Sequence, residues 1–153
     1  AVQGRARGRQ ADMSELLNLH YDVAGDDFVS CGHATEDVRR TLKSIGIPAD
    51  VIRKVSIAMY EGEINMVIHA DGGVADVEIC EDKIVVVLTD TGKGIEDIAR
   101  AMQEGFSTAT DEIRELGFGA GMGLPNMKKY SDSIDIESEV GRGTKVTLEF
   151  FIP

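Results

Sequence analysis

The hydrophobic and polar positions alternate in some stretches of the chain and repeat at helical spacing in others. Short stretches with apolar residues at every second position, or in an unbroken run, are typical of strands. They span residues 17–23, 74–80, 83–89, 134–138 and 144–152. Segments with helical spacing, or with helix start and stop residues, predict helices. They span residues 35–45, 49–70, 95–104 and 124–130.

The order of these elements predicts the fold class. The chain runs through one strand, two helices, two strands, a helix, a loop, a helix and two final strands. This order implies an α+β sandwich, in which the helices pack on one face of a mixed, mostly antiparallel sheet. Thr35 is expected to cap the first helix, with Glu36 and Asp37 in its first turn. Residues 105–118 mix Ser, Thr, Asp and Glu and predict a mobile loop.

The length of 153 residues fits one globular domain. Residues 1–12 are rich in Gly, Arg and Gln and have no apolar periodicity. We interpret them as a disordered leader or a cloning remnant, with a basic interaction arm as the alternative. Residues 13–153 then form the domain.

The composition excludes several classes of partner. Lys and Arg number 16 against 27 Asp and Glu, so the formal net charge is −11, which disfavours nucleic acid and anionic membranes. No apolar run approaches the length of a membrane span. The cysteines, Cys31 and Cys80, form no C-x-x-C pair, and no secretory segment is present, so we expect a cytoplasmic protein.

The long predicted helix has polar residues in an otherwise apolar sequence. Glu61, Asn65 and His69 recur every four residues, which places them in one stripe along one side of the helix. Burying a carboxylate and an amide is costly unless a partner pairs with them. The stripe therefore predicts a polar ligand cavity, and a solvated helix edge is the alternative.

Two glycine-containing segments are also candidates for chemistry. Asp90-Thr91-Gly92-Lys93-Gly94 follows an apolar strand, where a carboxylate can accept from an exocyclic amine; the alternative is a plain turn. Residues 117–124, GFGAGMGL, open a helix, so free backbone amides can converge on an anion. This segment is neither a Walker A loop nor a Rossmann fingerprint, and a flexible hinge is its alternative function.

Taken together and in this order, the motifs resemble those of the GHKL ATPase superfamily. Glu61-x-x-x-Asn65 resembles its N box, Asp90-x-Gly92-x-Gly94 its G1 box, and Gly119-x-Gly121-x-Gly123-Leu124 its G2 box. The segment Gly141-Arg142-Gly143-Thr144 resembles a late G-x-G-T element. The resemblance covers about residues 15–152 and implies a Bergerat-type ATP-binding fold.

The sequence around the N box is similar to one branch of that superfamily. Residues 65–70, NMVIHA, resemble the N-x-x-x-H-[GA] form of the anti-sigma-factor serine/threonine kinases (RsbT/RsbW/SpoIIAB-like). Residues 106–108, FST, resemble the lid of such kinases. Sensor histidine kinases usually have a basic residue where this chain has Ile68.

The resemblance implies a role for each matched residue. Asn65 would bind Mg²⁺ and Glu61 would be the general base. Asp90 would accept from the adenine amino group, with clearance at Gly94 and Thr144 completing the pocket. Backbone amides near Gly119, Gly121 and Gly123 would hold the phosphates. The cofactor-binding set is Asn65, Asp90, Gly92, Gly94, Gly119, Gly121, Gly123, Leu124 and Thr144.

The implied function is an ATP-dependent protein serine/threonine kinase of the anti-sigma, partner-switch type. Its substrate would be a Ser or Thr of a STAS-type antagonist protein, docked on the acidic surface and the lid, and a sigma factor is another expected partner. Homodimers are expected from the resemblance alone. The alternatives are an ATP-gated binding module that sequesters a regulator without phosphoryl transfer, and an orphan ATP-binding domain of a histidine kinase.

Overall fold

A computed structural model of the chain describes residues 2–5, 15–25, 28–70, 72–103 and 123–153. Within these residues, the strands form one sheet of order β1-β2-β3-β4-β6-β5 in which each neighbouring pair is antiparallel. The strands are β1 Val2–Arg5, β2 Glu15–Ala24, β3 Gly72–Cys80, β4 Lys83–Asp90, β5 Ser133–Glu139 and β6 Gly143–Phe151. The helices are α1 His33–Ser44, α2 Ala49–His69, α3 Ile98–Ala101 and α5 Gly123–Tyr130.

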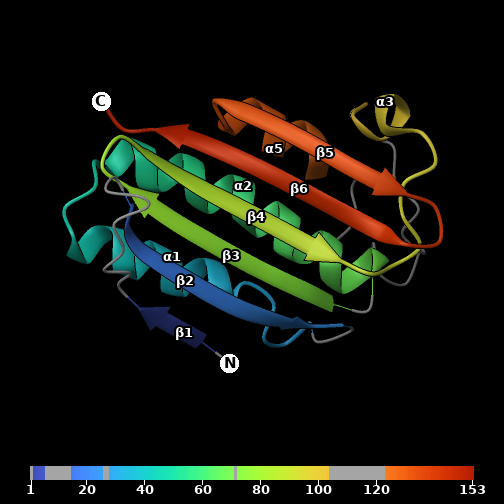
Figure 1. Cartoon of the computed structure of the whole chain (residues 1–153), viewed down its shortest axis with the longest axis horizontal. Helices are drawn as coiled ribbons and strands as arrows, with labels where there is room; N and C mark the ends of the chain where they lie inside the picture. Colours follow the sequence, from blue (N-terminus) through green and yellow to red (C-terminus); the bar gives the residue numbers. More distant parts are fainter. Residues whose placement is uncertain (1, 6–14, 26–27, 71, 104–122) are drawn as a thin grey trace.

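The α+β sandwich with helices on one face of the sheet is confirmed. Helices α1, α2 and α5 lie behind the sheet, and α3 lies at one end of it (Figure 1). The alternating strand pattern decides which face is buried, because successive side chains point to opposite faces. One inward row crosses the paired strands from β2 to β5 and consists of Tyr21, Ala75, Leu88, Val146 and Ile136.

Helix α2 is the central helix of this layer and is buried along most of its length. Gly62 explains how it approaches the sheet: a Cβ at this position would lie 2.1 Å from Leu88 Cδ1. A side chain here would require either the Leu88 side chain or α2 itself to shift in the packed core. The expectation of a well-buried helix over residues 49–70 is therefore confirmed.

The start of α1 differs from the expectation. The helix begins at His33 with Gly32 as its N-cap, whereas Thr35 lies inside the first turn. The expected cap at Thr35 is wrong because the free amides of this helix end are satisfied by Glu63 of α2. A side chain from another helix has replaced the local cap, and local sequence rules do not describe that arrangement.

The N-terminal segment also differs in part from the expectation. Val2–Arg5 pairs with β2 as an antiparallel edge strand, whereas residues 6–12 lie outside the described residues, so the predicted leader over 1–12 stays a prediction. Edge pairing uses backbone N–H and C=O groups, and it therefore needs no apolar periodicity. The predicted helix over residues 95–104 contracts to Ile98–Ala101, and the predicted loop over 105–118 lies outside the described residues.

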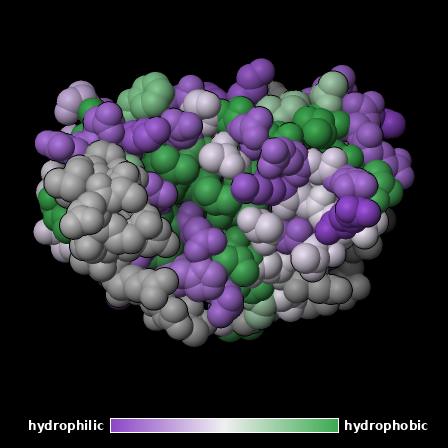
Figure 2. Space-filling model, in the orientation of Figure 1, coloured by the Kyte–Doolittle hydropathy of each residue, from purple (hydrophilic) through white to green (hydrophobic). Residues whose placement is uncertain are grey.

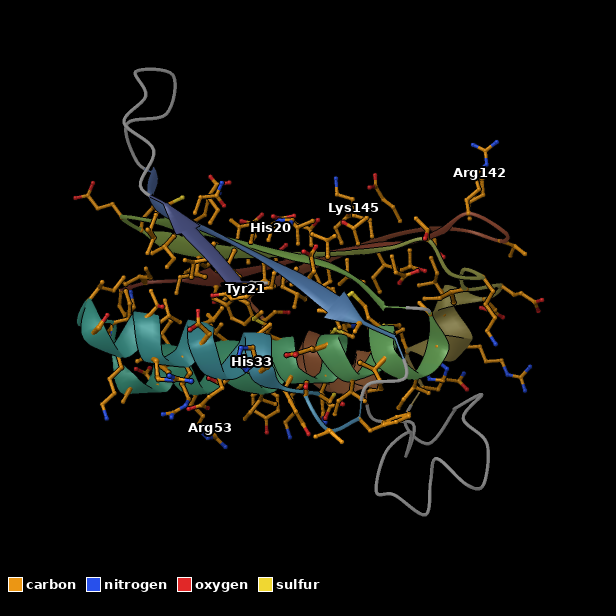
Figure 3. The ribbon with its side chains drawn as sticks, turned by 90° about the horizontal axis from the view of Figure 1, so that it is seen from below. His20, Tyr21, His33, Arg53, Arg142 and Lys145 are labelled. Atoms are coloured by element: carbon orange, nitrogen blue, oxygen red, sulfur yellow. The ribbon has the colours of Figure 1, made fainter. Side chains whose placement is uncertain are left out.

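The face of the sheet opposite the helices is uncovered in the described structure. Hydrophobic residues gather near its centre, with hydrophilic side chains around them (Figure 2). Figure 3 shows His20 and Lys145 on this open side, Tyr21 between the two layers, and Arg53 on the outer side of the helix layer. Among the described helices, no segment is both long enough and apolar enough to cross a membrane.

Candidate functional site

The predicted stripe on α2 is present and faces a neighbouring helix. Glu61, Asn65 and His69 are all partly exposed, although most of the surrounding α2 residues are buried. Glu61 Oε1 accepts a hydrogen bond of 3.2 Å from Asn126 Nδ2 of α5. A Cβ on Gly123 would lie 2.8 Å from Asn65 Nδ2, so the start of α5 lies directly against the Asn65 amide. Glu61 and Asn65 of the stripe therefore lie against α5, and the ligand cavity beside them stays a prediction.

The Asn65 amide makes no hydrogen bond within the described part of the chain. A half-buried amide without a protein partner is costly unless another group satisfies it. An amide oxygen beside a carboxylate suits Mg²⁺, which commonly takes only one or two protein ligands and otherwise binds water and phosphate oxygens. Asn65 therefore fits a magnesium site in which Glu61 is the neighbouring acid.

The segment after β4 folds back on its own carboxylate. Asp90 Oδ1 accepts a hydrogen bond of 2.9 Å from the Gly92 backbone N–H. Asp90 Oδ2 has no hydrogen bond among the described residues, so it is available to an external donor. A Cβ on Gly92 would lie 2.7 Å from the Ala70 Cβ, which places this turn against the residue that follows α2.

Gly143 and Thr144 lie beside Asp90 because β6 pairs with β4. Thr144 is the register partner of Asp90. Gly143 has a φ of 127°, and a Cβ there would lie 2.1 Å from the Asp90 carbonyl oxygen, so both conformation and space require glycine. The Thr144 hydroxyl lies 2.8 Å from the Ser138 hydroxyl, which also accepts from the Ile95 N–H at 2.8 Å. The late glycine element is thereby joined to the Asp90 segment.

Gly94 has a structural reason to be glycine. Its φ is 78°, and a Cβ would lie 2.4 Å from the Glu139 carbonyl oxygen at the end of β5. The Lys93 carbonyl also accepts from the Gly141 N–H at 2.9 Å. These contacts attach the loop to the β5–β6 turn, and the predicted clearance for an adenine ring stays a prediction.

His69 lies at the end of the stripe nearest Lys93. Burial lowers the pKa of the His69 imidazole, and the positive charge of Lys93 lowers this pKa further. The imidazole is therefore neutral near pH 7, and the cation at this end of the site is Lys93. A cation beside a partly exposed polar stripe favours an anionic ligand.

The described residues contain only the end of the glycine-rich segment. Helix α5 begins at Gly123, and Leu124 is buried in the core, where it holds the start of the helix in place. Gly119, Gly121 and the predicted lid at residues 106–108 lie outside the described residues. The structure thus brings together Glu61, Asn65, Asp90, Gly92, Gly94, Gly123, Leu124 and Thr144, drawn from α2, β4, α5, β6 and their connections.

The sequence of this region matches a known family over most of the chain. The family of histidine kinase-, DNA gyrase B-, and HSP90-like ATPases matches residues 50–153. The chain belongs to this family. The family is one of ATPases, so its match implies that this domain binds ATP, and the residues that would hold the nucleotide stay a prediction.

Curated relatives place the chain on the anti-sigma branch of this ATPase family. An anti-sigma F factor of Clostridium botulinum is 35% identical over 106 residues, which are 65% of this chain and 71% of the relative. One from Caldanaerobacter subterraneus is 36% identical over 66% of this chain and 71% of its own. The serine/threonine-protein kinase RsbT of Bacillus subtilis is 29% identical over 71% and 78% of the two chains.

Solved structures show the same fold at lower identity. The RsbU and RsbW domains of Rv1364c from Mycobacterium tuberculosis align with a TM-score of 0.61 and 16% identity. That alignment covers 88% of this chain but only 32% of the longer one. The mycobacterial sensor histidine kinase MprB aligns with a TM-score of 0.51 and 17% identity, covering 87% of this chain and 96% of the other. These likenesses concern the fold alone.

Three residues with structural contacts were not singled out from the sequence. Asn126 contacts Glu61 from α5, and Ser138 joins Ile95 to Thr144. Glu63 lies outside the site and holds the start of α1. One signal was available: an acid in a largely apolar helix segment requires a partner. Nothing local to Ser138 indicates its contacts, which depend on the packing of the β5 end.

Proposed function

We propose that this chain is an ATP-dependent protein serine/threonine kinase of the anti-sigma, partner-switch type. Its substrate would be a Ser or Thr hydroxyl on a STAS-type antagonist protein, and a sigma factor is the other expected partner. The names of the relatives support this class of function. The observation that carries the proposal is Glu61, a partly exposed carboxylate one helical turn from the unpartnered Asn65 amide.

The proposed reaction uses these residues in distinct ways. The substrate hydroxyl attacks the γ-phosphorus, the bond from that phosphorus to the β,γ-bridging oxygen breaks, and ADP leaves. Glu61 accepts the hydroxyl proton as the new oxygen–phosphorus bond forms. Asn65 would hold Mg²⁺, which when bound offsets the negative charge of the phosphates. Asn126 positions the Glu61 carboxylate through its hydrogen bond.

Nucleotide selection is assigned to the opposite end of the site. Asp90 Oδ2 would accept from the adenine 6-amino group, because Oδ1 is already bonded to Gly92. Thr144 would complete the adenine pocket from β6. The amides near Gly119, Gly121 and Gly123 would bind the phosphates. An Asp90→Asn variant should therefore weaken ATP binding, because the amide places a donor where an acceptor is required.

The experiment that tests the kinase proposal is transfer of labelled γ-phosphate from Mg-ATP to candidate STAS proteins. Acid-stable label on one protein, lost with Glu61→Gln, is the expected result. Acid-labile label on a histidine would instead identify a histidine-kinase ATP-binding domain. ATP binding without any label would contradict the kinase proposal and favour an ATP-gated binding module.

A further inference from the structure

The outer side of the helix layer carries a group of cations near the C-terminal end of α5. Arg53 and Lys54 of α2 and Lys128 and Lys129 of α5 are exposed. The Arg53 guanidinium lies 5.6 Å from the centre of the Tyr130 ring, and the Lys129 ammonium lies 5.3 Å from it. Tyr130 therefore holds cations from two helices around one ring. We call Arg53 and Lys129, together with Lys54 and Lys128 that adjoin them in sequence, the α2–α5 basic patch.

The cations of this patch have no acidic partner among the residues that the structure describes. Arg39, Arg40, Lys83 and Arg142 form ion pairs elsewhere in the structure. No ion pair joins a cation of the α2–α5 basic patch to a carboxylate in the described part of the chain. A concentration of unpaired cations on a chain of net charge −11 runs against its overall charge. Such a surface attracts an acidic partner by local complementarity.

Two carboxylates close in sequence form no ion pair with the patch in the described structure. Asp50 precedes Arg53 by three residues on α2, but no ion pair joins the two in the described structure. Asp132 follows Tyr130, and its Oδ2 accepts from the Phe151 backbone N–H at 2.8 Å. The patch keeps an excess of positive charge that these two carboxylates do not remove.

The position of the patch relates it to the candidate base. Arg53, Ile57, Glu61 and Asn65 recur every four residues, so Arg53 extends the same stripe of α2. On α5, Asn126 contacts Glu61, and Tyr130, one turn later, contacts Arg53. Arg53 therefore lies two turns from Glu61 along α2, about 12 Å at 1.5 Å per residue. Figure 3 shows Arg53 pointing away from the sheet, toward solvent.

We propose that the α2–α5 basic patch docks an acidic segment of the phosphoacceptor protein. The inference rests on the proposed kinase function, because a protein that brings its hydroxyl to Glu61 must also cover the neighbouring turns of α2. An acidic segment about 12 Å from the acceptor hydroxyl would reach Arg53 and Lys129 at the same time. The expected docking surface thus includes a basic area, in addition to the acidic surface expected from the sequence.

The first test is direct binding of a probe. Fluorescein-labelled hexaglutamate is titrated with the protein at low ionic strength and followed by fluorescence anisotropy. The double reversal Arg53→Glu/Lys129→Glu should weaken binding about tenfold, and added salt should weaken it for the unchanged protein. The matched control, Arg40→Glu/Lys43→Glu on α1, makes the same change in net charge and should affect binding much less.

Several results of this titration would overturn the inference. They are absence of peptide binding by the unchanged protein, equal weakening by both double variants, and tighter binding of a labelled oligothymidylate than of the peptide. The last result would indicate a nucleic-acid surface. None of these outcomes depends on phosphoryl transfer, so the titration stands even if the kinase proposal fails.

The second test uses the acceptor protein found by γ-phosphate transfer. Arg53→Glu/Lys129→Glu should raise the KM for that protein about tenfold and leave kcat and the Kd for ATP unchanged. An unchanged KM with transfer intact would overturn the docking inference alone. Loss of ATP binding in the double variant would also overturn it, because the patch would then act through the nucleotide site.

Discussion

Glu61 and Glu63 are two carboxylates on the same helix, and the structure gives them opposite environments. Glu63 is only 2% exposed, and it accepts hydrogen bonds from the backbone N–H groups of Gly32, Ala34 and Thr35 and from the Thr35 hydroxyl. Glu61 is partly exposed and accepts one hydrogen bond, from Asn126 at 3.2 Å. The acceptor oxygens of Glu63 are thus occupied by groups of the protein, whereas Glu61 keeps acceptor capacity for a ligand.

The difference comes from the direction in which each side chain leaves α2. Residues two apart are about 200° apart around a helix, so these carboxylates face different neighbours. Glu63 meets the N-terminus of α1, where free amides and the helix dipole favour a negative charge. Glu61 meets α5 at the edge of the proposed nucleotide site. Residue type alone therefore does not separate a structural acid from a candidate catalytic one, whereas the partner atoms do.

The largest expected effect is on catalysis through Glu61. Glu61→Gln keeps the size of the side chain and removes the base, so the rate of phosphoryl transfer should fall by about 10²–10⁴-fold. The free energy of unfolding should change by less than about 0.5 kcal/mol, because Asn126 can still donate to the amide oxygen. Single-turnover transfer and urea unfolding measure the two quantities. A large loss of stability would show that Glu61 is a structural residue like Glu63.

The next effect is on stability through Glu63. Glu63→Ala leaves three buried or half-buried amides and a hydroxyl without their acceptor, and should lower the free energy of unfolding by about 3 kcal/mol. Glu63→Gln keeps one acceptor oxygen and should lower it by about half as much. Urea unfolding at pH 7 measures both variants. If Glu63→Gln transfers phosphate as slowly as Glu61→Gln while remaining folded, the distinction between the two carboxylates is wrong.

A smaller effect is expected from the residue that positions Glu61. Asn126→Ala removes the single hydrogen bond to the carboxylate and should lower kcat about tenfold, with little change in the KM for ATP. Stability should fall by less than about 1 kcal/mol because Asn126 is only partly buried. Steady-state kinetics measures the effect, and Asn126→Asp serves as the comparison because it places a second carboxylate beside Glu61. Unchanged kcat in both variants would remove Asn126 from the site.

The smallest effect concerns pH and the far end of the Glu61 stripe. Burial, with Lys93, holds the pKa of folded His69 below the unfolded value of 6.5. Its contribution to stability is therefore fully present above pH 6.5 and is lost as pH falls toward the folded pKa. The free energy of unfolding, measured with urea between pH 7.5 and 5, should therefore fall less toward acid pH in His69→Gln than in the unchanged protein. An unchanged pH profile would contradict the burial of the imidazole.

His20 provides a control of opposite sign on the open face of the sheet. Its Nδ1 lies 2.6 Å from Asp76 Oδ1, and this hydrogen bond raises the pKa of the imidazole above 6.5. The contribution of His20 is therefore present below pH 6.5 and is lost as pH rises through its folded pKa. His20→Gln should remove stability on the acid side, which is the reverse of His69→Gln. The effect is small because both partners are exposed.

Much of the fold was predictable from local pattern. Strand alternation and helical spacing identified the elements from β2 to β6, because each must bury one face. The stripe at Glu61 and Asn65 and the glycine segments were likewise visible, since their spacing alone places them on one helix side or in a turn. The short α3 and the pairing of β1 were not, because helix length and edge pairing depend on neighbours more than on the segment itself.

The sequence by itself determined the element order, the inward rows and the motifs of an ATPase family. Only the tertiary structure decided which polar residues have their hydrogen-bonding groups satisfied within the protein. It assigned Glu63 to the start of α1, placed Asn126 beside Glu61, and brought Arg53 of α2 to the Tyr130 ring that Lys129 also contacts. The physical reason is that the contacts of Glu63, Asn126 and Arg53 join residues far apart in the chain, and their energies depend on the geometry of helices packed together.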